Sequence, residues 1–387
     1  MSELAQAFGS IMCVVGARPN YMKMAPLIRA LGSDPAAPRT TLVHTGQHYD
    51  VAMNDRLFAD LKLGAPDVNL GVGSGTHAQQ TAEIMRRFEP VIDAAAPSCV
   101  VVVGDVNSTL ACSLVAVKKG VPIVHVEAGL RSFDRSMPEE INRLLTDQIC
   151  DVLYTTERSA ADNLRREGVP MERVHFVGNV MIDSLLASLP HAIPPGAILE
   201  NNGLDTALPG ERGRFGLVTL HRPSNVDEQE SLAEALTILG EVSRELLLVW
   251  PMHPRTRVNI ERFGLWRLLD ARRVIALPPQ GYLETLGLIK EATLVITDSG
   301  GIQEETTALG VPCLTMRENT ERPITVEQGT NVVVGRKRAI IRRCVDEILA
   351  GGGKRGRVPE LWDGHASERI ATHLTSWLAR RVESIYA

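Results

Sequence analysis

Short runs of β-branched and other apolar residues alternate with helical patterns along most of this 387-residue chain. The clearest run is Cys99–Val103, with the sequence CVVVV, which is apolar at every position. A continuous apolar strand is typical of a parallel sheet that is covered by helices on both faces. The alternation therefore predicts an α/β fold with doubly wound parallel sheets.

Both halves of the chain show this pattern. The predicted strands are Ile11–Val15, Thr41–His44, Cys99–Val103, Val121–Val126, Asp151–Thr155, Arg173–Phe176, Phe215–Leu220, Leu246–Trp250, Arg273–Leu277, Leu294–Thr297, Cys313–Met316 and Asn331–Val334. The predicted helices are Met22–Leu31, Ala78–Ala95, Ser108–Lys118, Glu139–Cys150, Gln229–Arg244, Arg255–Phe263, Gly281–Glu291, Ile302–Leu309, Ala339–Gly351 and His365–Ser384.

The alternation is interrupted once, by a segment rich in Pro and Gly over Pro190–Gly213. Such a density of turn residues predicts a linker or a long surface loop. The length also favours two domains, because single cores stop growing beyond about 250–300 residues. We expect Rossmann-like domains at 1–188 and 189–364, and a closing helix at 365–387 that packs on the first domain. Ligands of such folds bind at the carboxyl ends of the strands, and here we expect them between the two domains.

Composition excludes several classes of protein. The chain has 41 Lys and Arg against 46 Asp and Glu, a net charge of −5, so it lacks the excess of basic residues of a nucleic-acid-binding protein. No apolar run reaches the ~20 residues of a membrane helix. The first residues lack the basic and apolar regions of a signal peptide, and none of the six cysteines forms a C-x-x-C pair. We expect a cytoplasmic protein with reduced, buried thiols and neither a membrane nor a nucleic-acid partner.

Two cations follow the first predicted strand. This position would carry G-x-G-x-x-G in a dinucleotide-binding enzyme, but only Gly16 is present, and the chain has no Walker A loop. Arg18 and Lys23 instead occupy the strand exit and the first turns of the next helix. They can receive a phosphate there, although a solvated basic surface explains them equally well.

A second candidate anion site follows Leu294–Thr297, where Ser299-Gly300-Gly301 precedes a helix. Glycines allow a ligand close to the backbone, and the first N–H groups of a helix attract an anion. The alternative is an ordinary helix start capped by Ser299 or Asp298. Glu305, one turn further on, can bind a pair of sugar hydroxyls.

Acidic side chains stand at the ends of two other predicted strands. Asp105 follows CVVVV, Glu127 follows the next strand, and Glu139 and Glu140 open a helix, where an acidic first turn is also ordinary. His221 ends the first strand of the second half, although a buried structural histidine is an alternative. The set suits acid–base chemistry better than a metal, because the chain has no H-x-x-H or H-E-x-x-H pattern. Covalent catalysis is not indicated, since there is no G-x-S-x-G elbow.

Together these segments resemble the non-hydrolysing UDP-N-acetylglucosamine 2-epimerase family. The matching stretches, in family order, are GARPNYMKMAPLI, TGQHYD, GDVNSTLA, HVEAGLRS, MPEEINR, TLHRPSN, DSGGIQEE and MRENTERP. The resemblance implies a two-domain fold of the glycosyltransferase-B type, a homodimer, a UDP-sugar substrate and neither a metal nor another cofactor. The second domain would bind UDP, and the first would carry most of the catalytic acids.

The resemblance also assigns residues. The family's catalytic positions fall on Asp105, Glu127, Glu139 and His221. Its UDP-contacting positions fall on Arg18, Lys23, Gln280, Ser299, Gly300, Gly301, Glu305 and Arg322. Gln47 and His253 match parts of a second, activating UDP-sugar site that some bacterial members use.

Three departures from the family pattern bear on these assignments. Pro223 and Ser224 follow His221-Arg222 where many members have Arg-Glu, which changes the neighbours of the histidine. Thr285 stands where an aromatic residue is common, which argues against stacking on uracil. Asp50 replaces a glutamine of the activating site, which argues against activation by substrate.

The implied reaction is reversible C2 epimerisation of UDP-N-acetylglucosamine to UDP-N-acetylmannosamine. UDP leaves C1 as a proton leaves C2, and it re-adds to 2-acetamidoglucal as a proton arrives on the other face. One alternative is an epimerase of a modified sugar such as UDP-2,3-diacetamido-2,3-dideoxyglucuronate, which GTHAQQT and RSFDRSMPEEINRLLTD also resemble. The others are a hydrolysing relative, a glycosyltransferase of the same fold and a non-catalytic nucleotide-sugar sensor.

Overall fold

The computed structural model describes residues 9–46, 61, 63–204 and 214–386. The chain divides into two compact units. The first unit comprises Met1–Ala187 together with Glu360–Ala387, and the second comprises Ser188–Pro359. Glu360–Gly364, which we expected in the second domain, thus lie with the first unit.

The first unit is built on a seven-stranded sheet in the order β3-β2-β1-β4-β5-β6-β7, in which every pair is parallel. The strands are β1 (Ile11–Val15), β2 (Thr40–His44), β3 (Val68–Asn69), β4 (Cys99–Val103), β5 (Ile123–Val126), β6 (Val152–Thr155) and β7 (Val174–Phe176). The helices are α2 (Arg18–Ser33), α4 (His77–Ala95), α5 (Asn107–Lys118), α6 (Pro138–Ile149), α7 (Arg158–Arg166), η1 (Met171–Arg173), α8 (Val180–Ser188) and α17 (Ala366–Tyr386).

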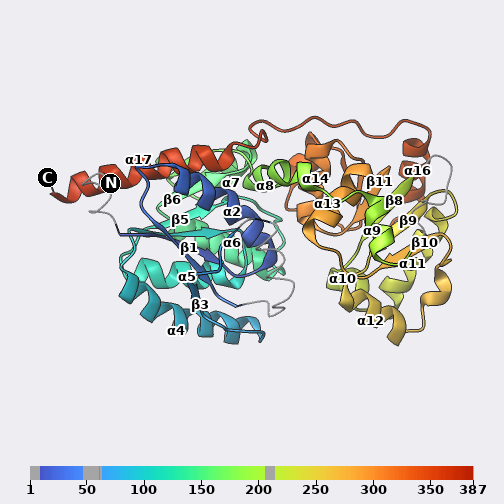
Figure 1. The fold of residues 1–387 in the computed structure, drawn as a ribbon, viewed down its shortest axis with the longest axis horizontal. Coiled ribbons are helices and arrows are strands. Elements are labelled where there is room, and N and C mark those ends of the chain that lie inside the picture. Colours follow the sequence, from blue (N-terminus) through green and yellow to red (C-terminus); the bar gives the residue numbers. More distant parts are fainter. Residues whose placement is uncertain (1–8, 47–60, 62, 205–213, 387) are drawn as a thin grey trace. The chain divides into compact units, whose positions relative to one another are not determined.

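Helices cover both faces of this sheet. Helix α5 packs between α4 and α6, whereas α2 packs against α17. In Figure 1, α17 lies above the strands and α4 and α5 lie below them. Strand β4 is buried at every position, as its continuous apolar sequence predicts for a strand covered on both sides.

The second unit is built on a six-stranded parallel sheet in the order β10-β9-β8-β11-β12-β13. Its strands are β8 (Phe215–Thr219), β9 (Leu247–Pro251), β10 (Val274–Leu277), β11 (Leu294–Thr297), β12 (Cys313–Thr315) and β13 (Asn331–Val333). Its helices are η2 (Leu189–His191), α9 (Pro195–Asn201), α10 (Pro223–Val226), α11 (Gln229–Val242), α12 (Pro254–Arg262), η4 (Trp266–Leu268), α13 (Tyr282–Glu291), α14 (Gly300–Leu309), α15 (Pro323–Glu327) and α16 (Arg338–Leu349).

The prediction of a linker or loop over Pro190–Gly213 is wrong for its first part. Helix α9 forms there, with prolines just before and at its first position, where proline is well tolerated. Ile198 and Leu199 are buried in an apolar cluster with Phe215 and Leu217 of β8. This segment is therefore part of the core of the second unit. Residues 205–213 lie outside the described part of the chain.

All six cysteines are buried and free, as expected. Burial raises the pKa of the Cys13 thiol to about 12, with a smaller contribution from the charge of Asp67. Such a thiol stays protonated at neutral pH and is a poor nucleophile.

The loop between β1 and α2 lies directly against the start of α5. A Cβ atom added at Gly16 would lie 2.1 Å from Ser108 Oγ, so only glycine fits there. Ser108 in turn forms a 2.7 Å hydrogen bond with Thr45 after β2. The loops that follow β1, β2 and β4 therefore meet at one edge of the sheet.

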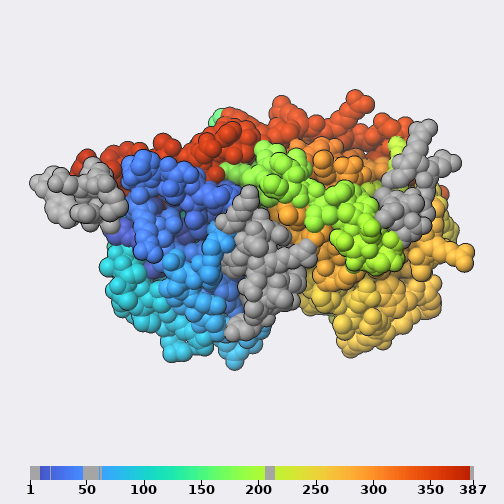
Figure 2. Space-filling model, viewed as in Figure 1, coloured from blue at the N-terminus to red at the C-terminus, as the bar shows by residue number. Residues whose placement is uncertain are grey.

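The C-terminal helix α17 is fixed at its start by α8. Asp183 of α8 accepts hydrogen bonds from the backbone N–H groups of Ala366 and Ser367, at 3.1 and 2.6 Å. Figure 2 shows α17 running over the surface of the first unit beside α2.

Among the residues that the structure describes, no helix is both long and apolar enough to cross a lipid bilayer.

His373 of α17 meets His175 of β7. The rings of His175 and His373 lie 3.9 Å apart, and a 2.8 Å hydrogen bond joins His373 Nδ1 to the Tyr154 hydroxyl. Burial, and then the positive charges of His175 and Arg380, lower the pKa of His373 to about 4. The pKa of His175 is lowered in the same direction, chiefly by burial.

This contact predicts a pH-dependent stability. The unfolded chain takes up a proton at residue 373 below about pH 6.5, whereas the folded chain does so only near pH 4. The free energy of unfolding should therefore fall as the pH falls from about 6.5 to about 4. We expect a smaller loss of Tm between pH 7 and pH 5 in His373→Gln than in the wild type. The control is His365→Gln, which replaces an exposed histidine directly before the same helix. Equal losses of Tm in the wild type and in His373→Gln would show that His373 does not cause the pH-dependent loss of stability.

Candidate functional site

Two candidate acids lie at the carboxyl edge of the first sheet. Strands β4 and β5 are neighbours, with Val103 paired to Val126, so the residues that follow them emerge side by side. Asp105 follows β4 after Gly104, and Glu127 follows β5 directly. A Cβ atom at Gly104 would lie 3.8 Å from Glu127 Oε1, which shows how closely the two loops approach.

Glu127 is held in a strained and buried position. Its φ angle is +74°, in the left-handed region that a non-glycine residue rarely adopts, and only 3% of the residue is exposed. Lys23 of α2 lies 2.6–2.7 Å from both carboxylate oxygens of Glu127 and is itself buried. The backbone N–H of Glu127 donates to Tyr154 O on β6. Strain maintained by such surrounding contacts is typical of functional residues.

Asp105 is bound by an arginine that the sequence reasoning did not single out. Arg143 of α6 donates to Asp105 Oδ2 from Nε and Nη2 at 3.0 and 2.5 Å, and to Glu140 from Nη1 at 2.7 Å. Glu140 accepts from the backbone N–H groups of Ser132 and Phe133, and it is buried. Glu140 is therefore structural, whereas Glu139 is only partly buried in the first turn of α6.

A buried charge network joins the loops that carry both acids. His125 of β5 binds Asp147 through Nδ1 at 2.7 Å and Gly104 O through Nε2 at 2.8 Å. Asp147 also accepts from Arg131 and from the backbone of Gly129. The sequence signal was a histidine within an otherwise apolar strand, but its partners lie far away in the chain.

In the second unit, His221 follows β8 and is 41% exposed, so it is not a buried structural histidine. Its Nδ1 atom lies 3.1 Å from Asp298, which follows β11, the neighbour of β8. Burial by itself would raise the pKa of Asp298, but hydrogen bonds from His221, Arg222 and Asn225 and the charge of His221 hold it below its usual value. The sequence pattern predicts no more for Asp298 than a possible helix cap.

The start of α14 has the features of an anion site. Ser299 is the N-cap residue, but within the described residues its hydroxyl makes no capping hydrogen bond, and Asp298 binds the His221 loop instead. The capping alternative is therefore wrong for both residues. Gly300 and Gly301 begin the helix. Their backbone N–H groups are of the kind that binds phosphate at helix starts.

Other predicted contacts of UDP lie in the same unit. Arg322 is 6% exposed, with its Nε atom 3.0 Å from Glu304 Oε1. Glu305 is 4% exposed. Gln280 follows β10, and its amide nitrogen donates to Pro278 O at 2.9 Å.

For three of the predicted residues, the structure gives little support for a role in ligand binding. Arg18 begins α2, and its side chain is not among those described. Gln47 lies outside the described residues. His253 caps α12, where its Nδ1 atom accepts from Arg255 N at 3.2 Å, and its ring lies 5.8 Å from that of His221.

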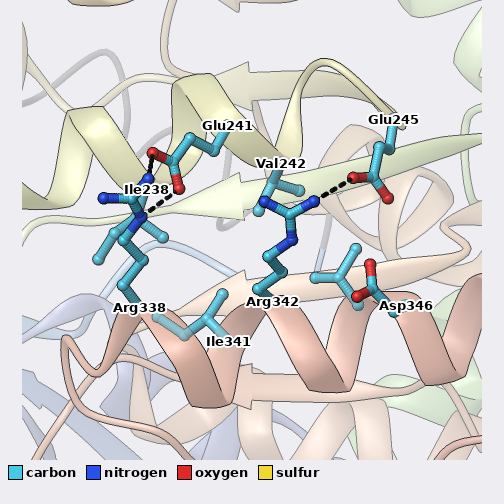
Figure 3. Close-up of a pocket in the computed structure, with 9 residues that line it drawn as sticks. Ile238, Glu241, Val242, Glu245, Arg338, Ile341, Arg342 and Asp346 are labelled. Carbon is cyan, nitrogen blue, oxygen red and sulfur yellow. Dashed lines mark hydrogen bonds and ion pairs between the residues drawn. The ribbon is translucent and has the colours of Figure 1, made fainter.

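Three pockets within the described residues lie away from the candidate acids and from His221; one of about 700 Å³ is lined by residues along α17, and one of about 450 Å³ lies among α2, α8 and α17. Across the described ranges, no group of three or more His, Cys, Asp or Glu side chains is arranged to hold a metal. The pocket between α11 and α16 has a volume of about 20 Å³, enough for a single water molecule. Figure 3 shows it beside the pairs Arg338–Glu241 and Arg342–Glu245, which join the two helices.

Comparison with known proteins gives a consistent answer. The model of the UDP-N-acetylglucosamine 2-epimerase family matches residues 31–375. The UDP-N-acetylglucosamine 2-epimerase of Methanococcus maripaludis is 41% identical over 339 residues, covering 87% of this chain and 90% of the relative. The UDP-2,3-diacetamido-2,3-dideoxy-D-glucuronate 2-epimerase of Pseudomonas aeruginosa is 40% identical over 372 residues, covering 94% and 99%.

Among solved structures, the UDP-GlcNAc 2-epimerase of Methanocaldococcus jannaschii in complex with UDP-GlcNAc and UDP matches with a TM-score of 0.85. It is 38% identical, and the match covers 95% of this chain and 99% of that one. The predicted fold class, two Rossmann-like domains of the glycosyltransferase-B type, is confirmed. The chain belongs to the UDP-N-acetylglucosamine 2-epimerase family.

Proposed function

We propose that this chain interconverts UDP-N-acetylglucosamine and UDP-N-acetylmannosamine without hydrolysis. The observation that carries the proposal is the pair of carboxylates, Asp105 and Glu127, held at one sheet edge by Arg143 and Lys23. The names of the relatives and the UDP-GlcNAc bound to the Methanocaldococcus jannaschii enzyme support the substrate.

The proposed chemistry follows from the weak acidity of the proton on C2. A carboxylate takes this proton as the bond from C1 to the UDP oxygen breaks, so the C–H electron pair forms the C1=C2 double bond of 2-acetamidoglucal. UDP then re-adds at C1 while a proton is delivered to the opposite face of C2. Asp105, Glu127 and Glu139 supply the acid–base groups, because a carboxylate at such a position accepts and returns a proton.

The second unit is proposed to hold the nucleotide. The helix start at Ser299–Gly301 binds the diphosphate, as helix N-termini do. The family resemblance supports Arg18, Lys23 and Arg322 as further cations for the diphosphate and His221 as the group that acts on the leaving group. Gln280 and Glu305 are the proposed contacts to the uridine. The family resemblance further supports a homodimer, and together with the reduced thiols it supports a cytoplasmic location.

A modified UDP-sugar is the second candidate substrate. It is favoured by the Pseudomonas aeruginosa relative, which is 40% identical, against 41% for the Methanococcus maripaludis enzyme. The two substrates differ at C3 and C6, whereas the chemistry at C1 and C2 is the same. Comparing kcat/KM for the two sugars under identical conditions distinguishes these candidates.

The test is incubation of the protein with UDP-N-acetylglucosamine in D2O, followed by NMR of the products. We expect UDP-N-acetylmannosamine with deuterium at C2, and deuterium also in the recovered substrate, because the reaction is reversible. Free N-acetylmannosamine with UDP would identify a hydrolysing enzyme. An epimer without deuterium would exclude elimination with solvent exchange, and turnover only with an added acceptor would identify a glycosyltransferase.

A further inference from the structure

We infer that Asp298 is a positioning residue that fixes the tautomer of His221, so that the Nε2 atom of the imidazole serves the reaction. This inference rests on the proposed function, because it concerns how His221 serves the departing and returning UDP. It adds a residue that the family resemblance did not assign.

The carboxylate of Asp298 is fully enclosed and accepts several hydrogen bonds. It is 0% exposed and follows β11, next to β8, whose end carries His221. The backbone N–H groups of His221 and Arg222 donate to Oδ2 at 3.0 and 2.9 Å, and Asn225 Nδ2 donates to the same oxygen at 3.1 Å. The other oxygen, Oδ1, lies 3.1 Å from His221 Nδ1 and also accepts from the backbone N–H of His221 at 3.1 Å.

These contacts determine which nitrogen of His221 carries hydrogen. The donors around Asp298 and the charge of His221 lower the pKa of the carboxyl group, although burial opposes them. Asp298 is therefore ionised at neutral pH, and an ionised carboxylate only accepts hydrogen bonds. His221 Nδ1 must then carry a hydrogen and donate it to Oδ1.

The consequence concerns the other ring nitrogen. With Nδ1–H committed to Asp298, Nε2 is the atom that takes or gives a proton, and the 41% exposed ring leaves it accessible. An imidazole with a carboxylate at Nδ1 is also stabilised when it becomes a cation. It can thus balance negative charge that develops on a diphosphate as the C1–O bond breaks.

The neighbouring histidine provides an internal contrast. His253 Nδ1 accepts from Arg255 N, which requires that its hydrogen, when the ring is neutral, is on Nε2. The rings of His221 and His253 lie 5.8 Å apart, so two adjacent histidines are held in opposite tautomers by different partners. The carboxylate of Asp298 is what sets His221 apart.

The variant Asp298→Asn tests this directly. With its amide oxygen at the Oδ2 position, the asparagine keeps the donors that bind there and loses only the second contact of His221 N at Oδ1. Its NH2 group then faces His221 Nδ1 and forces the hydrogen onto Nε2. We expect kcat for epimerisation to fall about 10²–10⁴-fold, as when an Asp behind a catalytic histidine becomes Asn, with Kd for UDP changed less than about 3-fold. The control is Asp346→Asn, which replaces an exposed residue of α16 and should keep the wild-type kcat.

The tautomer itself is measured by ¹⁵N NMR of the histidine rings, with His221→Asn used to identify the signal of His221. We expect a protonated Nδ1 in the wild type and an unprotonated Nδ1 in Asp298→Asn. An unprotonated Nδ1 in the wild type overturns the inference even if the variant does not fold. Wild-type kcat in a folded Asp298→Asn protein also overturns it. Absence of epimerisation by the wild type, with the expected spectra, refutes the proposed function but leaves the tautomer assignment standing.

Discussion

Glu127→Gln should lower the rate of C2 epimerisation by about 10²–10⁴-fold, the usual range for loss of a general acid or base. The amide has nearly the same shape as the carboxylate and can still accept a hydrogen bond from Lys23, but it cannot take the proton from C2. Lys23 lies within 2.7 Å and the backbone of Glu127 is already strained, so the side chain is held in one position. UDP binding, measured by calorimetry, should change little, because Glu127 is not among the proposed contacts of UDP and the amide still accepts a hydrogen bond from Lys23.

The matched control is Glu89→Gln. Glu89 is exposed on α4 and pairs with Lys119, so the same chemical change there should leave kcat unaltered. Asp105→Asn and His221→Asn should behave like Glu127→Gln, with turnover suppressed and UDP still bound. Wild-type turnover in all three variants would refute the site assignment.

Asp147→Asn should lower the stability of the protein more than Glu127→Gln, Asp105→Asn or His221→Asn. Its carboxylate is completely buried between His125 and Arg131, and the charges of these two groups lower its pKa although burial opposes them. Removing one partner of a buried ion pair typically costs about 3–5 kcal/mol, because the remaining charges stay buried without compensation. Catalysis should fall as well, because His125 also binds Gly104, next to Asp105.

Since the chain has two units, a single unfolding transition need not describe it. The appropriate measurement is amide hydrogen exchange in β4, β5 and α6 of the first unit, which should accelerate in Asp147→Asn while the second unit is unaffected. The control is Asp93→Asn, an exposed acid that pairs with Lys119 on the same unit. Unchanged protection in Asp147→Asn would show that the network contributes little to stability.

The strands were largely predictable because burial on both faces leaves an unbroken apolar sequence. Ile11–Val15, Cys99–Val103 and Leu294–Thr297 begin and end where the sequence predicts. Most other ends differ by one or two residues, because helix and strand ends depend on local hydrogen bonds. The start of α2 lies four residues before the predicted Met22, and β3, α7, α8, α10 and α15 were not predicted. Helix α9 was missed because its prolines suggested a loop, whereas tertiary packing of Ile198 and Leu199 makes it part of a core.

The candidate site was partly predictable for the same reason. A parallel strand delivers the residue at its carboxyl end to one edge of the sheet, so Asp105, Glu127 and His221 could be placed from the pattern alone. Their partners could not. Arg143, Asp147 and Asp298 are 38, 22 and 77 positions from the groups they bind, and no local pattern encodes these pairings.

The sequence by itself thus determined the parallel α/β architecture, the sheet edge on which the acids lie and, through its motifs, the family. The tertiary structure decided how those groups are held. It showed that Lys23 and Arg143 bind the two acids and that Asp298 faces the histidine. It also showed that, within the described residues, the Ser299 hydroxyl makes no capping hydrogen bond. The physical reason is that apolar periodicity is a local property of the chain, whereas ion pairs and hydrogen bonds depend on which strands become neighbours.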